Sequence, residues 1–266
     1  MPLSQLLLLA LVQGLTEFLP VSSSAHLILA PIAAGLEDQS PLIDVMAHGG
    51  SLMAVLVYFW RDIRDVALGK LAWLSGRMTP GGRLALLVGA ATPPIIIAAG
   101  ALYLTGQTDL FRSPLIIGIA TLVFAVPLWA ADRYGRTHVT AETLGYGSAF
   151  LIGMVQVFAL IPGASRSGVT MTAGRALGLG RSESARFSML MAIPVIAAFA
   201  LVAGLDLAQG GDGTASLADG LIVAVLSFLA AWASIAVMMR FVERVGFLPF
   251  VVYRLILAGL IFWLLV

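Results

Sequence analysis

Long runs of apolar residues, separated by short polar stretches, extend over the whole chain. A helix needs about 20 mostly apolar residues to cross the hydrocarbon core of a bilayer. Six runs meet this length, so the pattern predicts an all-α polytopic membrane protein with six transmembrane helices. The expected spans are Leu42–Trp60, Leu84–Leu104, Pro114–Ala131, Phe187–Leu207, Leu217–Met239 and Phe247–Val266.

Two further apolar regions are interrupted before they reach a full span. The run from Pro2 to Leu19 meets Pro20 and three serines, and only a short apolar piece follows. The run from Gly145 to Ile161 meets Pro162-Gly163 and a polar cluster in the same way. We expect each region to form two half-helices joined by a polar break.

The distribution of Lys and Arg decides whether these broken regions cross the membrane. Cytoplasmic loops are enriched in both residues. If both regions are re-entrant hairpins, twelve loop cations fall on one side and only Arg112 on the other. If the second region crosses instead, Arg240 and Arg244 move to the outside. The charges therefore favour two re-entrant hairpins, the first entering from outside and the second from the cytoplasm.

The two breaks also resemble each other in sequence. Residues 12–24 read V-Q-G-L-T-E-F-L-P-V-S-S-S, and residues 155–167 read V-Q-V-F-A-L-I-P-G-A-S-R-S. Each hairpin is followed by three spans, an odd number, so the second half lies upside down relative to the first. We therefore predict one membrane domain over 1–266, built as an inverted-topology repeat of about 1–135 and 140–266, with broken helices meeting near the midplane.

Composition supports the membrane class and excludes several kinds of chemistry. The chain is 60% hydrophobic and 11% charged, whereas soluble domains carry about 25% charged residues. Because cysteine is absent, disulfides, thiolate nucleophiles and cysteine metal sites are excluded. The net charge of +1 gives no reason to expect a nucleic-acid partner.

The polar breaks have the chemistry of an anion site. Serines favour the N-cap position, and the amide groups at a helix N-terminus attract phosphate. Arg166 adds a planar cation that can hold two phosphate oxygens. An arginine at membrane depth costs about 2.5–3.5 kcal/mol and is usually functional. The candidate phosphate-binding residues at the breaks are Ser22, Ser165, Arg166 and Ser167.

Acid–base candidates precede and follow the first serine cluster. Gln13 and Glu17 are four residues apart and share one helical face. Glu17 is a candidate general base or metal ligand, and His26 a candidate acid–base group or nucleophile. A serine beside either group is an activatable nucleophile. A hard divalent cation is expected beside a carboxylate and phosphates, with Asp44 as a second carboxylate ligand.

Structural interpretations compete with these roles. Serines in apolar helices often bond to the carbonyl four residues earlier, and Glu17 could form an ion pair with an arginine. His48 could face a cavity or be a satisfied interior histidine. Tyr253 and Arg254 in the last span are expected to pair internally or reach toward the interface.

The motifs together resemble the undecaprenyl-diphosphatase (bacitracin-resistance) family. The resemblance rests on Q-G-L-T-E-F-L-P-V-S-S-S-A-H at 13–26 and P-G-A-S-R-S-G-V-T at 162–170. F-S-M-L-M-A-I-P at 187–194 and the segment at 244–254 are also similar to family segments, so the likeness covers essentially the whole chain. Many members have glutamate at the position of Gln13, glycine at that of Ala25 and an amide at that of His48.

This resemblance implies a function and a set of site residues. Such enzymes are phosphatases of the bacterial inner membrane that convert undecaprenyl diphosphate to the monophosphate carrier of cell-wall synthesis, and they need Mg²⁺ or Ca²⁺. The implied fold has six spans, two re-entrant pairs and a site that opens outward, to the periplasmic side. By motif position, Gln13, Glu17, Ser22, Ser23, His26, Ser165, Arg166, Ser167 and Thr170 form the site.

The expected mechanism is an in-line displacement with the diphosphate between the two half-helix starts. We expect Ser23, activated by Glu17, to be the nucleophile; His26 is the alternative. The polyprenyl tail would contact membrane lipid, and small-residue spacings of the GxxxG kind are compatible with a homodimer.

Two other classes of function compete with the phosphatase. Inverted repeats with broken helices are typical of transporters, so the chain could transport or flip prenyl phosphate lipids. A purely structural membrane protein is the third interpretation, but it leaves Glu17 and Arg166 unexplained.

Overall fold

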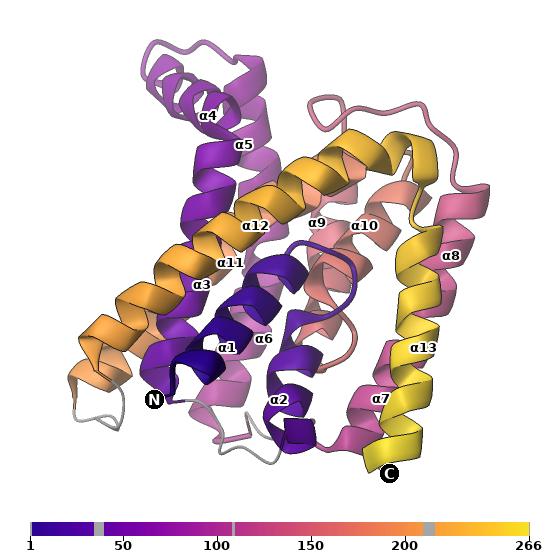
Figure 1. Cartoon of the computed structure of the whole chain (residues 1–266). Helices are drawn as coiled ribbons and strands as arrows, with labels where there is room; N and C mark the ends of the chain where they lie inside the picture. Colours follow the sequence, from indigo (N-terminus) through magenta and orange to yellow (C-terminus); the bar gives the residue numbers. More distant parts are fainter. Residues whose placement is uncertain (1, 35–39, 108–109, 210–215, 266) are drawn as a thin grey trace.

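The computed structural model describes residues 2–34, 40–107, 110–209 and 216–265, and within these ranges it contains helices and no strand. Figure 1 shows their arrangement. The helices are α1 (Leu3–Thr16), α2 (Ser23–Ala34), α3 (Pro41–Tyr58), α4 (Trp60–Trp73), α5 (Pro80–Ala91), α6 (Pro93–Leu104), α7 (Pro114–Val123), α8 (Ala125–Tyr134), α9 (Tyr146–Gln156), the 3₁₀ turn η1 (Val157–Leu160), α10 (Arg166–Ala176), α11 (Arg181–Ala208), α12 (Leu217–Val245) and α13 (Leu248–Leu265).

Six spans are long and apolar enough to cross a membrane, which confirms the predicted all-α class and the number of spans in the described part of the chain. Helices α3, α11, α12 and α13 each form one span. The other two are each divided by a local irregularity, α5–α6 at Thr92 before a Pro-Pro pair and α7–α8 at Phe124. Proline lacks an amide hydrogen and interrupts the helical ladder, which accounts for the first division.

The two broken regions fold back on themselves as helix pairs. In Figure 1, α1 rises from the lower end and α2 returns to it, whereas α9 descends from the upper end and α10 returns upward. The turns between the helices occupy residues 17–22 and 161–165. Both pairs are thus hairpins that enter from opposite ends of the molecule. Their re-entrant position in a bilayer, the repeat of 1–135 and 140–266, and a homodimer stay predictions.

Helix α12 runs between α1 and α3, and glycines allow the backbones to approach closely. A Cβ atom added to Gly50 of α3 would lie 2.1 Å from the Ala224 oxygen of α12. A Cβ atom added to Gly14 of α1 would lie 2.6 Å from the Ala230 Cβ. Without a strong hydrophobic force between helices in lipid, such small-residue contacts supply the packing. Gly50 therefore acts as a packing residue between α3 and α12.

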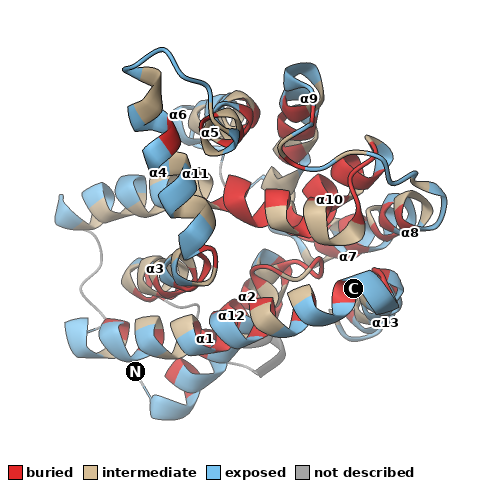
Figure 2. Cartoon of the chain, turned by 90° about the horizontal axis from the view of Figure 1, so that it is seen from above, coloured by how far each residue is buried: buried red, intermediate tan, exposed pale blue. Residues whose placement is uncertain are grey.

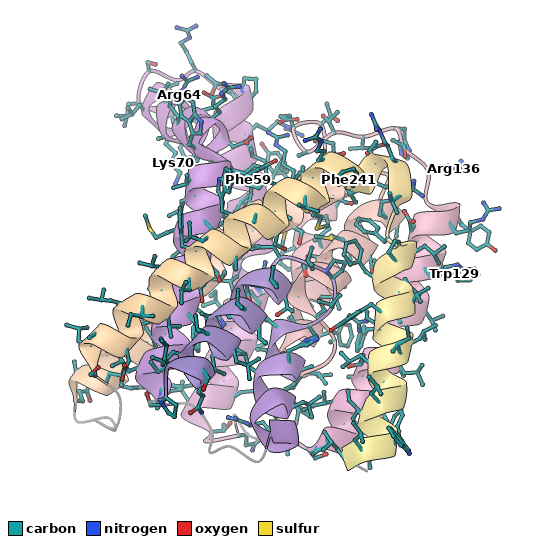
Figure 3. The ribbon with its side chains drawn as sticks, in the orientation of Figure 1. Phe59, Arg64, Lys70, Trp129, Arg136 and Phe241 are labelled. Atoms are coloured by element: carbon teal, nitrogen blue, oxygen red, sulfur yellow. The ribbon has the colours of Figure 1, made fainter. Side chains whose placement is uncertain are left out.

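One end of the molecule carries most of the charged groups. Arg64, Lys70 and Arg136 all lie at the upper end in Figure 3. At this end the Arg186 guanidinium of α11 forms ion pairs with Asp62 of α4 and, at 2.7 Å, with Glu142. Burial raises the pKa of Glu142, but its bonds to Arg186 outweigh this effect and leave the pKa below its usual value. This cationic end has the character expected of the cytoplasmic side.

Buried residues concentrate around α10 and the adjoining part of α11, while the outward faces of the peripheral helices are exposed (Figure 2). Helix α10 has eleven residues, of which five are polar, and eight of the eleven are buried. A polar helix enclosed by apolar spans must find hydrogen-bond partners inside the protein, because lipid offers none. The centre of the fold is therefore the place where polar groups of the two hairpins meet.

The close approach of α3 and α12 leads to a matched pair of substitutions. We expect Gly50→Ala to lower stability by about 1–3 kcal/mol, because the new methyl group overpacks the contact with α12. Gly49→Ala is the control, since a Cβ there meets nothing within 4 Å and alanine is the better helix former. Thermal unfolding of the detergent-solubilised variants measures the difference, and equal melting temperatures would contradict the close contact.

Candidate functional site

The turns of the two hairpins are in direct contact at the centre of the molecule. The Gly163 amide donates a hydrogen bond to Ser22 Oγ at 3.1 Å, and the Ser167 hydroxyl donates to the Leu19 carbonyl at 2.8 Å. These bonds join residues more than 140 positions apart in sequence. The expectation that the two polar breaks converge on one place is therefore confirmed.

The breaks share an unusual backbone geometry. Ser22 has φ 76° and Ser165 has φ 71°, and these are the two non-glycine residues with positive φ among those described. Each precedes a helix, and each serine oxygen accepts from the amide three residues later, Ala25 at 3.4 Å and Gly168 at 3.1 Å. Left-handed backbone at a non-glycine residue costs roughly 1–3 kcal/mol and is concentrated at functional sites. The predicted N-cap role of both serines is confirmed.

Glu17 is the centre of the polar contacts. One carboxylate oxygen accepts from the Ser23 hydroxyl at 2.6 Å and from the Gln13 amide at 3.1 Å, and the other accepts from Arg166 at 3.1 Å. The Glu17 side chain is 6% exposed and that of Arg166 is 12% exposed. The interpretation of Glu17 as an ion-pair partner is thus correct, and the same carboxylate also holds the candidate nucleophile.

Arg166 reaches from the second hairpin into the first. Its guanidinium also donates to the Glu17 carbonyl at 3.3 Å and to the Ser188 carbonyl of α11 at 3.4 Å, and it lies over the Phe18 ring at 5.7 Å. The sequence suggested an anion as its natural partner, and the structure supplies a carboxylate. A permanent cation is thereby fixed beside Ser23 and Glu17 by contacts on several sides.

Three hydroxyl groups of the second hairpin, those of Ser165, Ser167 and Thr170, are buried near Arg166. Thr170 Oγ1 donates to the Arg166 carbonyl at 2.8 Å and lies 2.6 Å from the Ser188 hydroxyl of α11. The Ser165 and Ser167 hydroxyls lie 3.2 Å apart. The structure thus brings the predicted Ser165, Ser167 and Thr170 together around the start of α10, where they support the position of Arg166. The sequence pattern did not point to Ser188, because serine is common in spans.

His26 lies beside Ser22, and within the described residues no hydrogen bond joins it to Ser23. Its Nδ1 is 2.7 Å from the Ser22 carbonyl, and its Nε2 is 2.6 Å from the Tyr253 hydroxyl of α13. The two rings are stacked with centroids 5.7 Å apart. Tyr253, which the sequence assigned to internal pairing, therefore pairs with a candidate catalytic residue.

Helix α3 contributes a histidine to the site's surroundings. The His48 ring contacts the Phe199 ring of α11, with centroids 4.9 Å apart. Asp44, the predicted second metal ligand, lies one turn earlier, and its backbone oxygen is 2.8 Å from His48 Nδ1. Among residues 2–34, 40–107, 110–209 and 216–265, no three His, Asp or Glu side chains are grouped closely enough to hold a metal ion.

The protein nevertheless offers oxygen ligands for a cation that would be held jointly by protein groups and substrate phosphates. The Gln13 carbonyl oxygen is buried and accepts no hydrogen bond from the described residues, although it lies in the same side chain that contacts Glu17. Mg²⁺ prefers oxygen ligands and is often held by one or two protein groups together with substrate phosphates. Gln13 and Glu17 fit that kind of site, and they do not form a cation cage by themselves.

Arg254 connects both breaks to the spans around them. It is fully buried in α13 and donates to the carbonyls of Pro20 in the first break and of Gly163 and Ala164 in the second. It also donates to Ala120 and Thr121 of α7. The sequence left open whether this residue pairs internally or reaches toward the interface, and the structure shows internal pairing. The sequence gave no sign that the partners would be the backbone of the two breaks.

An apolar hollow of about 320 Å³ borders the turn of the first hairpin. Leu15 and Leu19 of the hairpin form one wall, and Val237, Phe241 and Phe250 of α12 and α13 contribute to the other. Ser234 of α12 closes the edge next to the hairpin by donating to the Leu15 carbonyl at 2.9 Å. A surface suited to hydrocarbon thus begins at the residues that frame Glu17.

The chain is similar to known proteins over nearly its whole length. Residues 6–260 match the family model described as bacitracin resistance protein BacA. A protein named undecaprenyl-diphosphatase from Maricaulis maris is 68% identical over 256 residues, which cover 96% of each chain. Proteins of the same name from Ruegeria pomeroyi and Alcanivorax borkumensis are 48% and 46% identical, each covering 96% or more of both chains.

The contacts of Arg254 predict a large loss of stability on its replacement. Arg254→Met keeps much of the side-chain volume but leaves several carbonyl groups without a donor, and each such group costs about 1–3 kcal/mol. We expect the melting temperature of the solubilised protein to fall by roughly 5–10 °C. Arg136→Met, at an exposed position, is the control and should melt like the wild type. Equal melting of both variants would rule out Arg254 as the residue that joins the breaks.

Proposed function

Because this chain belongs to the bacitracin resistance protein BacA family, we infer that it is a membrane phosphatase that hydrolyses undecaprenyl diphosphate to undecaprenyl phosphate and inorganic phosphate. The family and the relatives' names support this activity across the whole chain. The product is the lipid carrier used in bacterial cell-wall synthesis. Recycling of this carrier agrees with the bacitracin resistance after which the family is named.

The observation that carries the proposal is the buried chain of contacts from Ser23 through Glu17 to Arg166. A hydroxyl 2.6 Å from a carboxylate oxygen is positioned to lose its proton as it attacks. A guanidinium held by the other carboxylate oxygen places a fixed positive charge beside that hydroxyl. Phosphoryl transfer depends mainly on positioning and on stabilisation of negative charge, and these three side chains supply both.

In the first step, Ser23 Oγ attacks the terminal phosphorus in line with the bridging oxygen. Its proton passes to Glu17, the bond from phosphorus to the bridging oxygen breaks, and the lipid monophosphate departs. Arg166 stabilises the charge on the transferred group, while Ser165, Ser167 and Thr170 hold the start of α10 and Ser22 holds that of α2. Water then attacks the phosphoserine, and inorganic phosphate is released.

A divalent cation, Mg²⁺ or Ca²⁺, is part of the proposal. The protein groups that would hold the cation next to the diphosphate are the buried Gln13 carbonyl oxygen and the Glu17 carboxylate. Asp44 of α3 would be the second carboxylate ligand. When bound, the ion would neutralise phosphate charge. Glutamine at position 13 lowers the negative charge of this ligand set compared with two carboxylates.

The site is proposed to face the outer side of the bacterial cytoplasmic membrane. The chain is a multi-span membrane protein, and its cationic loops support a cytoplasmic position for the opposite end. The first hairpin, which carries Ser23 and Glu17, enters from the end without these loops (Figure 1). A diphosphate headgroup in the outer leaflet would reach Ser23 from that end.

The decisive measurement uses purified protein in detergent with a prenyl diphosphate and counts released inorganic phosphate. We expect turnover by the wild type and a loss of at least about a hundredfold in Ser23→Ala and Glu17→Ala, since each removes a group that acts in the transition state. Ser24→Ala changes the neighbouring, exposed serine and should keep most activity.

Each alternative outcome has a distinct meaning. Wild-type protein that releases no phosphate in detergent but moves prenyl phosphates across vesicles would identify a transporter. Near-normal turnover by Ser23→Ala together with loss in His26→Ala would exclude the serine nucleophile. Activity that survives complete chelation of divalent ions would exclude the cation.

The apolar hollow beside the first hairpin is proposed to hold part of the polyprenyl tail. Val237→Trp fills this hollow, whereas Val225→Trp adds the same bulk to an equally exposed position elsewhere on α12. We expect Val237→Trp to raise KM several-fold for a long-chain diphosphate and little for a short-chain one, because only the long tail reaches the hollow. An equal effect of the two variants on both substrates would contradict this location.

A further inference from the structure

The contacts of His26 determine which of its nitrogens carries the proton. Nδ1 is 2.7 Å from the Ser22 carbonyl, and a carbonyl oxygen only accepts hydrogen bonds. Nδ1 therefore donates. In the neutral ring Nε2 is then the acceptor, and the Tyr253 hydroxyl, 2.6 Å away, donates to it. The imidazole is thus held with its basic nitrogen directed at a phenol from another helix.

This pair lies on the same side of α2 as the proposed nucleophile. Ser23 and His26 are three residues apart in one helix, so their side chains project from one face. Tyr253 is 43% exposed even though it contacts His26, so the protein does not enclose the phenol. A phenolic oxygen that donates its own proton to Nε2 keeps lone pairs with which it accepts a proton from water.

Glu17, the other proton acceptor of the proposed site, already accepts a hydrogen bond from the nucleophile. Ser23 donates to Glu17 at 2.6 Å, and no bond joins Ser23 to His26 among those of the described residues. Glu17 takes the serine proton in the first step of the proposed mechanism. The second step, attack of water on phosphoserine, needs a different acceptor while Glu17 still holds that proton. His26 is a neutral base whose Nε2 is joined to the Tyr253 hydroxyl, which the protein leaves partly exposed.

We propose that Tyr253 relays a proton from the attacking water to His26 during hydrolysis of the phosphoserine. The water O–H bond breaks, its proton goes to the Tyr253 oxygen, and the Tyr253 proton goes to His26 Nε2. The water oxygen bonds to phosphorus, the bond from phosphorus to Ser23 Oγ breaks, and Ser23 recovers its proton from Glu17. Imidazolium then returns the proton to solvent. This inference rests on the proposed phosphatase function.

The experiment combines turnover with trapping of the covalent intermediate on the full-length protein. The substrate is a prenyl diphosphate with ³²P in its terminal phosphate, and the variants are Tyr253→Phe, His26→Asn and the double variant. Phenylalanine keeps the ring that stacks on His26 and removes only the hydroxyl. Asparagine keeps a donor near the position of Nδ1 and removes Nε2. Tyr146→Phe, on α9, is the matched tyrosine control.

We expect Tyr253→Phe to lower kcat roughly ten- to a hundredfold, within the range of general acid–base effects, with KM nearly unchanged. Labelled protein should accumulate in Tyr253→Phe and His26→Asn, and the label should resist acid and be released by alkali, as a phosphate ester is. The double variant should lose no more activity than His26→Asn, because both residues act in one relay. Tyr146→Phe should match the wild type.

Several results would overturn the relay. Independent, multiplicative losses in the double variant would show that Tyr253 acts apart from His26. A raised KM with unchanged kcat in Tyr253→Phe would make the hydroxyl a binding group, and an acid-labile label would point to a phosphohistidine. Wild-type protein without any phosphate release would remove the proposed function itself, whereas an active wild type with an unaffected Tyr253→Phe would remove only the relay.

Discussion

A helix that breaks inside a membrane leaves backbone carbonyl groups with no water to bind, and the fold depends on how these groups are satisfied. Arg254 performs this role for both breaks, because its guanidinium donates to Pro20 in one and to Gly163 and Ala164 in the other. Within the described part of the chain no carboxylate pairs with this arginine, so its charge is balanced by carbonyl dipoles. One side chain from the last span thereby holds the two turns against each other.

Side chains of the two turns and the adjoining helix starts complete the contact between the hairpins and form the candidate site. Ser22 accepts from the Gly163 amide, Ser167 donates to Leu19, and Arg166 pairs with Glu17 across the same boundary. Most of these contacts bury polar groups, which are costly in an apolar environment unless they are paired. The requirement for pairing brings a carboxylate, a hydroxyl and a guanidinium together, and these are the groups that phosphoryl transfer uses. The structural and chemical roles of Glu17 and Arg166 are therefore compatible.

The proposed mechanism uses two proton acceptors, Glu17 and His26, and the hydrogen bonds of each one determine which proton it accepts. Glu17 is bonded to Ser23, whereas His26 is bonded to Ser22 and Tyr253. In the proposed mechanism, these two bases on one short helix pair therefore serve different protons without competing. Ser22, whose backbone is left-handed, accepts from His26 Nδ1 through its carbonyl, while its side chain caps α2. Local strain of this kind persists only where surrounding contacts hold it, as they do here.

The sequence alone determined the class of protein, the six spans and most of the candidate site. Apolar runs of sufficient length can form only helices in a membrane, and residues such as Glu17 and Arg166 are conspicuous there because burying a charge is expensive. The spacing of Gln13, Glu17, Ser23 and His26 along short helices also placed them near one another. The tertiary structure decided which partners these groups have. That Arg166 meets Glu17, that Tyr253 meets His26 and that Arg254 binds both breaks depends on helices distant in sequence. A polar residue in an apolar run can be recognised from the sequence, because its burial is costly. Its partner is determined by how the helices pack in three dimensions.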